Sequence, residues 1–141
     1  MRESGLIKKI NDRLPKSIHH QSMTGASLTH NGVPDQYYDG TNTDMWIEYK
    51  QLTAMPRSGM VGGVDNKKQG KYRTLQFKWM RRRYENCIAA GVVPNVFGVI
   101  GLPNGRAVIQ TLPRQWEHGC EISGALTIKE IADWITDFSG P

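Results

Sequence analysis

The feature that most constrains the fold is an extended segment at residues 33–52. Two runs flank a turn-rich stretch at 39–44, and the second run, 45–52, alternates in the manner of a half-buried strand. Pro34 additionally disfavours a helical backbone for the residue before it. The pattern predicts a β-hairpin over 33–52.

The two ends of the chain predict helices. Apolar residues at helical spacing indicate a helix over 3–14. A weaker strand candidate, rich in Ser, Thr and Gly, follows at 18–28. Near the C-terminus, Thr127 and Glu130 form a capping-box pattern that opens an amphipathic helix at 127–138.

The middle of the chain adds a loop, a helix and a second hairpin. A glycine-containing loop is expected over 53–70, and Thr74 is expected to cap a helix over 75–90. Apolar and β-branched residues predict strands at 92–100 and 106–111. The apolar face expected for the helix carries Phe77, Met80, Tyr84, Cys87 and Ile88. This order predicts an α/β (α+β) fold with a short mixed sheet between helices.

Length and charge restrict the class of protein further. The chain has 141 residues, which predicts a single domain over 1–141, and 18 Lys and Arg against 13 Asp and Glu give it a net charge of +5. Eight of those basic residues lie within 67–83, where no acidic residue occurs. They are Lys67, Lys68, Lys71, Arg73, Lys78, Arg81, Arg82 and Arg83. A basic loop and helix of this kind indicates contact with nucleic-acid phosphates, although a solvated helix face would have the same composition.

Neither a membrane nor an organic cofactor is expected. The uncharged stretch 87–105 contains glycine and proline residues that would break a lipid-exposed helix. The chain has only two cysteines, and no secretory signal pattern opens it. These features favour an intracellular, cytoplasmic location.

Three residues of the predicted hairpin carry the most chemical information. Side chains alternate along a strand, so Glu48 and Lys50 project from one face about 6 to 7 Å apart. If the hairpin is symmetric about residues 41 and 42, Asp35 lies opposite Glu48 and Tyr38 opposite Met45, at a spacing of about 5 Å. Two carboxylates and an ammonium group then converge on one face.

This trio suits hydrolysis of a phosphodiester. Carboxylate and carbonyl oxygens are ligands that Mg²⁺ prefers, and Mn²⁺ is expected to substitute for it. Lys50 is placed to orient or deprotonate the attacking water, or to offset charge on the phosphoryl group. The plainer interpretation is a cross-strand surface pair of acids with a lysine.

Pro34-Asp35 followed by Glu48-x-Lys50 resembles the signature of the PD-(D/E)xK nuclease superfamily, over residues 3–100. The nearest branches are small phage and archaeal Holliday junction resolvases and the virus-type replication-repair nuclease module. The resemblance implies a restriction-endonuclease-like core with a four-stranded mixed sheet, and Mg²⁺-dependent cleavage of nucleic acid. Met80 stands where recombination-exonuclease-like members have a tyrosine, which disfavours that branch.

The resemblance also implies a role for each site residue. Asp35 and Glu48 would bind the metal, together with the carbonyl of Tyr49, and Lys50 would be the catalytic lysine. Glu3 would correspond to the acid that many members supply from their first helix, or it would be a plain solvated acid. Gln76 would correspond to the glutamine near the start of the helix that follows the lysine strand.

Two functions from different classes follow. The first is a Mg²⁺-dependent DNA endonuclease, structure-selective for branched DNA and dimeric, because cutting both strands of a junction needs two active sites. The second is a catalytically inert, basic nucleic-acid-binding module on the same fold.

Overall fold

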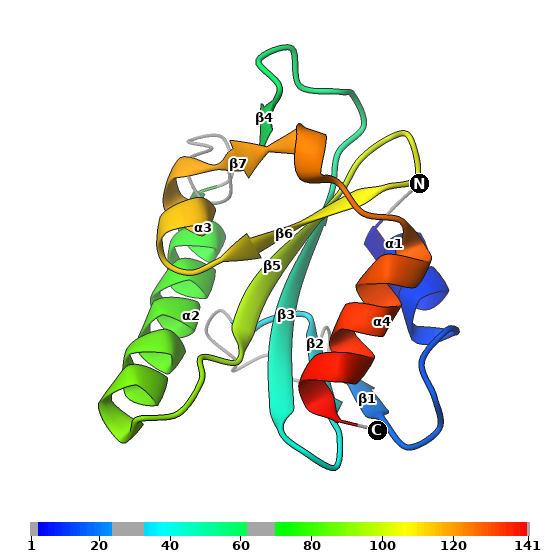
Figure 1. The fold of residues 1–141 in the computed structure, drawn as a ribbon. Coiled ribbons are helices and arrows are strands. Elements are labelled where there is room, and N and C mark those ends of the chain that lie inside the picture. Colours follow the sequence, from blue (N-terminus) through cyan, green and yellow to red (C-terminus); the bar gives the residue numbers. More distant parts are fainter. Residues whose placement is uncertain (1–2, 24–32, 62–69, 141) are drawn as a thin grey trace.

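The computed structural model describes residues 3–23, 33–61 and 70–140, with the backbone alone for 70–74 and for Glu117. A five-stranded sheet forms the centre of the fold, with helices on both of its faces (Figure 1). This arrangement confirms the predicted fold class.

The central sheet has the strand order β1-β2-β3-β5-β6. Its strands are β1 (His19–Ser22), β2 (Gln36–Asp39), β3 (Asp44–Gln51), β5 (Val96–Gly101) and β6 (Ala107–Thr111). The β3–β5 pair is parallel and the others are antiparallel, so the sheet is mixed. The edge strand β1 makes five strands, where the resemblance implied four.

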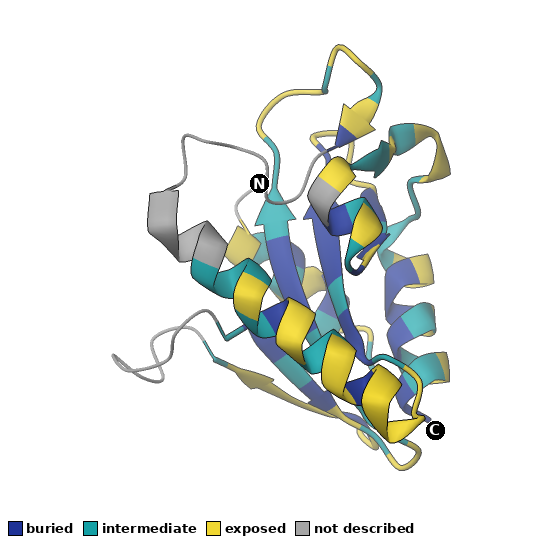
Figure 2. Ribbon diagram, turned by 90° about the vertical axis from the view of Figure 1, so that its left-hand side faces the viewer, coloured by how far each residue is buried: buried dark blue, intermediate teal, exposed yellow. Residues whose placement is uncertain are grey.

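Three long helices cover the sheet. Helices α1 (Glu3–Asn11) and α4 (Ile128–Ser139) pack on the face that carries Met45, Ile47 and Tyr49 of β3. Helix α2 (Gly70–Ala90) packs on the other face, against Val96 and Ile100 of β5. Figure 2 shows the exposed outer side of α2 with buried strands behind it. The sheet therefore separates two apolar clusters.

The sequence does not predict the small module that lies beside β6. It contains β4 (Met60–Val61), α3 (Arg114–His118), β7 (Cys120–Glu121) and a short 3-10 helix at Ile122–Gly124. Strands β4 and β7 pair with each other. Trp116 of α3 is buried against the glycine at position 98, where an added Cβ would collide with the indole ring. Elements this short lack a readable hydrophobic period.

Several predicted boundaries at the start of the chain were wrong. Helix α1 ends at Asn11 and not at Leu14, because the chain tightens there: the Arg13 N–H donates to Ile10 and the Leu14 N–H to Asn11, each three residues back. The strand expected over 18–28 is observed only at His19–Ser22, and its part from residue 24 onwards lies outside the described residues.

The predicted loop and helix in the middle also needed correction. The loop expected over 53–70 contains β4, and α2 begins at Gly70, so Thr74 lies inside the helix and is not its cap. Ile88 was expected on the buried face, but it is 55% exposed. The strand expected from 92 begins only at Val96, because the preceding valines are exposed.

Candidate active site

The β2–β3 hairpin brings Asp35 and Glu48 together as predicted. The ladder pairs Gln36 with Ile47 and Tyr38 with Met45, which sets Asp35 opposite Glu48. The Asp35 N–H donates to Glu48 Oε1 (3.2 Å). The Tyr49 N–H donates to Asp35 Oδ2 (3.1 Å). Both carboxylates are thus held by main-chain donors at one end of the hairpin.

Lys50 and Gln76 complete the immediate surroundings of Glu48. The Lys50 ammonium lies 3.0 Å from Glu48 Oε2 and forms an ion pair with it. Lys50 Nζ also donates to Gln76 Oε1 (3.4 Å), which connects β3 to α2. Gln76, which the resemblance places near the start of the helix after the lysine strand, therefore lies next to Lys50.

Both carboxyl groups are harder to ionise than in water. Burial raises the pKa of Glu48 to about 8, and the nearby negative charge of Asp35 adds to the effect, while Lys50 opposes it. Burial also raises the pKa of Asp35 to about 6, although the hydrogen bond from the Tyr49 N–H lowers it. Two acids with raised pKa values in one place are typical of a functional site.

Glu3 acts on this site through its charge. Its side chain is exposed at the start of α1, and its carboxylate raises the pKa values of both Asp35 and Glu48. Within residues 3–23, 33–61 and 70–140, however, no three His, Cys, Asp or Glu side chains form a group able to hold a metal ion. Glu3 therefore does not complete a three-acid cluster in this structure.

A buried hydroxyl pair behind the site was missed from the sequence. The Tyr38 and Tyr49 hydroxyls lie 2.7 Å apart on the face opposite to the carboxylates. The Tyr38 hydroxyl also donates to Asn11 Oδ1 (2.8 Å) at the end of α1. This network joins α1 to β2 and β3. The one sequence signal for this network is Asn11, a polar residue at the end of the apolar face of α1.

Asp44 has a structural role that the sequence did not reveal. Residue 44 closes the stretch 39–44 that the sequence predicts as a turn. In the structure its Oδ1 accepts a hydrogen bond from Asn95 Nδ2 (2.8 Å) and its Oδ2 accepts one from the Tyr37 hydroxyl (2.8 Å). Arg83 of α2 also donates to Asn95 (3.1 Å). Asp44 therefore links β2, β3 and the start of β5, well away from Glu48.

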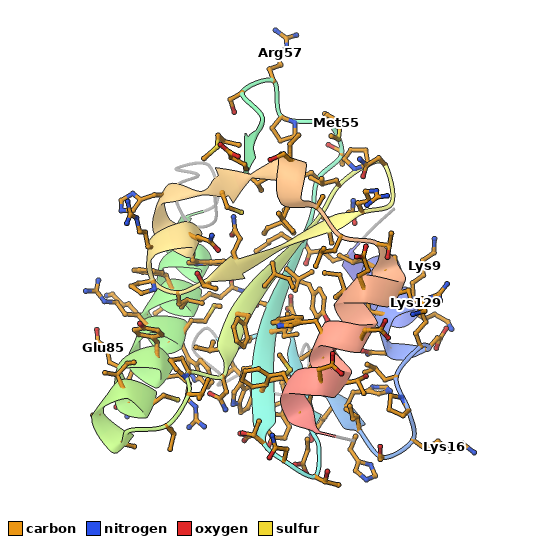
Figure 3. The ribbon with its side chains drawn as sticks, in the orientation of Figure 1. Lys9, Lys16, Met55, Arg57, Glu85 and Lys129 are labelled. Carbon is orange, nitrogen blue, oxygen red and sulfur yellow. The ribbon has the colours of Figure 1, made fainter. Side chains whose placement is uncertain are left out.

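The basic residues expected to bind nucleic acid fall into two groups. Lys78, Arg81 and Arg82 are exposed on the outer side of α2, as predicted. Figure 3 shows Glu85 of the same helix pointing outwards, and it pairs with Arg81 (3.0 Å). The other predicted side chains, those of Lys67, Lys68, Lys71 and Arg73, lie outside the described part of the chain.

A cavity of about 770 Å³ lies away from the carboxylates. Residues of β6, α3, β7 and the 3-10 helix line it, among them Arg114, His118 and Cys120. None of the residues that the sequence analysis singled out for catalysis or metal binding lines this cavity.

Comparison with known proteins identifies the fold. No family model and no curated protein matches the sequence. Among solved structures, Hjc from Archaeoglobus fulgidus, a Holliday junction resolvase from an archaeal hyperthermophile, matches with a TM-score of 0.53 over 94% of this chain and 97% of its own. The chain shares its fold with Hjc. The two sequences are 14% identical.

The structural match to Hjc distinguishes between the two branches that the sequence motif resembles. Archaeal Holliday junction resolvases are one of the branches that the PD-(D/E)xK signature suggested, whereas the virus-type nuclease module gains no specific support. In the described part of the chain, none of the helices is long and apolar enough to cross a membrane. At this identity the Hjc-like fold alone is established.

Proposed function

We propose that the chain is a metal-dependent endonuclease that hydrolyses phosphodiester bonds of DNA, with a preference for branched DNA such as a Holliday junction. The single observation that carries the proposal is the convergence of Asp35, Glu48 and Lys50 at one point of an Hjc-like fold. A surface ion pair would not need a carboxylate that is 0% exposed, because acidic residues are seldom fully buried.

The residues present fit a Mg²⁺ ion, with Mn²⁺ as a substitute. Among the described residues, Glu48 Oε2 is buried with no hydrogen bond of regular geometry, and the Lys50 ammonium lies 3.0 Å from it. A divalent cation would offset the burial that raises the pKa of both acids. Asp35, Glu48 and the Tyr49 carbonyl would supply hard oxygen ligands. Glu3 would add negative charge nearby and, after rearrangement of its side chain, a further ligand.

The bound metal would polarise the phosphoryl group and lower the pKa of a water molecule. The chain's own residues would place charge, orient one another and contact the DNA. Lys50, 3.0 Å from Glu48 Oε2, would hold a proton or a positive charge beside the attacked phosphate. Gln76, 3.4 Å from Lys50 Nζ, would fix the direction of the ammonium group and contact the DNA. The main-chain N–H of Tyr49 would keep Asp35 oriented.

Helix α2 would hold the DNA backbone. Its exposed side carries Lys78, Arg81 and Arg82, and it packs on the same face of the sheet as Glu48 and Lys50. Basic side chains on one helix contact phosphates without reading sequence. Lys67, Lys68, Lys71 and Arg73 would extend this contact surface. We also propose a homodimer, because one domain carries one such site and resolving a junction requires two cuts.

An inert nucleic-acid-binding module is the alternative. The ion pair between Lys50 and Glu48 favours it, because such a pair also satisfies both charges without any metal. The two functions differ in one observable: only the nuclease converts bound DNA into cleaved product.

The test compares metals and substrates. The wild-type protein is expected to nick or cut a labelled four-way junction with Mg²⁺ or Mn²⁺, and to bind it without cutting in Ca²⁺. Glu48→Ala is expected to abolish cutting and to keep binding. Single-stranded, duplex, flap and RNA substrates in the same assay define the preference. Cleavage that persists in Glu48→Ala would sink the assignment, and binding without cleavage under every metal would favour the inert module.

A further inference from the structure

Three aromatic rings form a continuous cluster beside the carboxylates. The centroids of Tyr37 and Trp46 are 4.5 Å apart with the rings tilted by 49°, and those of Trp46 and Trp79 are 5.0 Å apart in an edge-to-face arrangement. The rings come from β2, β3 and α2 in turn, so the cluster crosses from the hairpin to the helix. All three side chains are only partly buried.

The position of this aromatic cluster relative to the site follows from the strand register. Tyr37 pairs with Trp46, and the next pair on the same face is Asp35 with Glu48. Side chains two residues apart on a strand lie about 6 to 7 Å apart. The Tyr37–Trp46 end of the cluster therefore lies about 6 to 7 Å along the hairpin from the carboxylates.

Two arginines lie beside the Trp79 end of the cluster. Trp79, Arg82, Arg83 and Asn86 line a shallow cavity of about 240 Å³. Arg83 also acts on the Tyr37 ring, since its charge lowers a phenol pKa that burial raises to about 12. Aromatic faces flanked by arginines are the combination that binds unpaired nucleotides, by stacking on the base and by attraction to the phosphate.

We propose that the Tyr37–Trp46–Trp79 cluster offers a ring face to an unpaired nucleobase next to the phosphate that is cut. The cluster and its arginines would select DNA in which a base has left the helical stack, as at a branch point, over intact duplex. This inference rests on the proposed nuclease function, but base stacking is measurable without any cleavage.

The first experiment uses the wild-type protein without a divalent metal. Oligothymidylate and an abasic strand of equal length carry the same phosphates, so they differ only in their bases. Oligothymidylate is expected to quench tryptophan fluorescence and to bind about tenfold or more tightly than the abasic strand. Equal affinities without a difference in quenching would overturn the proposal.

The second experiment locates the stacking. Trp79→Leu is expected to weaken oligothymidylate binding about tenfold while changing duplex binding little, because phosphate contacts dominate the latter. Trp134→Leu is the matched control, because Trp134 is also partly buried but packs on Phe97 (4.9 Å) at the opposite face of the sheet. Equal losses for both DNA forms, or for both variants, would contradict the proposal. If Trp79→Leu does not fold, the comparison of the two strands on the wild-type protein decides.

The outcome is separable from that of the nuclease assignment. A protein that stacks bases but never cuts DNA would overturn the proposed function and keep this inference. A protein that cuts junctions but binds abasic and normal strands equally would keep the proposed function and overturn this inference.

Discussion

At the scale of single residues, the structure places a fully buried glutamate beside a half-buried aspartate. Glu48 is 0% exposed, and its only close positive charge among the described residues is the Lys50 ammonium. Burying a carboxylate this way costs free energy, because the interior solvates charge less well than water. Such a cost is typical of sites that are kept for chemistry.

This burial predicts how stability depends on pH without metal. The pKa of Glu48 is about 8 in the folded protein, against 4.5 for an ordinary glutamate, so between these values the folded protein binds more protons than the unfolded one. The free energy of unfolding should therefore fall as pH rises through this window. Glu48→Gln removes the ionisation, so its stability relative to wild type should improve by about 1–3 kcal/mol between about pH 5 and pH 8.

Urea unfolding in the presence of a chelator measures this difference. Asp39→Asn is the control, because Asp39 lies on the same hairpin with an exposed side chain. A pH dependence that is identical in wild type and Glu48→Gln would show that Glu48 is not buried in the way described.

The arrangement of the hairpin could be predicted from sequence, because turn residues and strand alternation are local properties. The pairing of Asp35 with Glu48 followed from them. The burial of Glu48 could not be predicted, since it depends on α2 packing over the sheet. The hydroxyl pair of Tyr38 and Tyr49 was equally hidden, because its partner Asn11 lies 27 residues before Tyr38.

At the scale of elements, helix ends decided which predictions were correct. The capping box of α4 is present as predicted: the Glu130 N–H donates to Thr127 Oγ1 (3.1 Å) and the Thr127 N–H donates to Glu130 Oε1 (2.9 Å). The predicted start of α2 was wrong, because Thr74 lies inside the helix, which already begins at Gly70. The predicted end of this helix at residue 90 is correct, and Gly91 follows it with a φ of +72°.

The cap of α4 predicts a stability change that leaves the site intact. Thr127→Ala removes the acceptor for the Glu130 N–H and should lower the free energy of unfolding by about 1 kcal/mol. Lys129→Ala, in the same exposed turn, should change it little, because its pair with Asp133 is on the surface. Thermal unfolding of both variants tests this. Equal losses would mean that the cap contributes nothing specific.

Helix α2 predicts how binding depends on salt. The double variant Lys78→Ala and Arg82→Ala should bind DNA more weakly, and its plot of log affinity against log salt should flatten by about one for each phosphate that the protein no longer neutralises. Lys9→Ala with Lys129→Ala is the matched control, because Figure 3 shows both lysines pointing outwards from α1 and α4. An equal flattening in the control pair would argue against α2 as the DNA-binding surface.

In the whole molecule, the central sheet separates an apolar face from the face that carries the candidate site. One face carries the apolar cluster packed under α1 and α4, whereas the other carries the acids, the lysine and the aromatic cluster beneath the basic helix α2. The net charge of +5 is a sum over the whole chain and does not show this difference between the two faces. The small module of α3, β4 and β7 covers one end of the apolar cluster that lies between α2 and the sheet.

The described residues form one such site, and cutting both strands of a junction needs two, so we predict a dimer during catalysis. Native mass spectrometry or sedimentation of the complex with a four-way junction should give two chains per junction. A single chain bound to each junction while both strands are cut would contradict the proposed homodimer.

The most direct test of the central claim compares two aspartates of one hairpin. Single-turnover cleavage of a labelled four-way junction in Mg²⁺ is measured for the wild type, Asp35→Asn and Asp39→Asn, after Ca²⁺ binding has shown that all three bind equally. The account predicts that Asp35→Asn loses cleavage by about a thousandfold or more, while Asp39→Asn cuts at the wild-type rate. Undiminished cleavage by Asp35→Asn would contradict it.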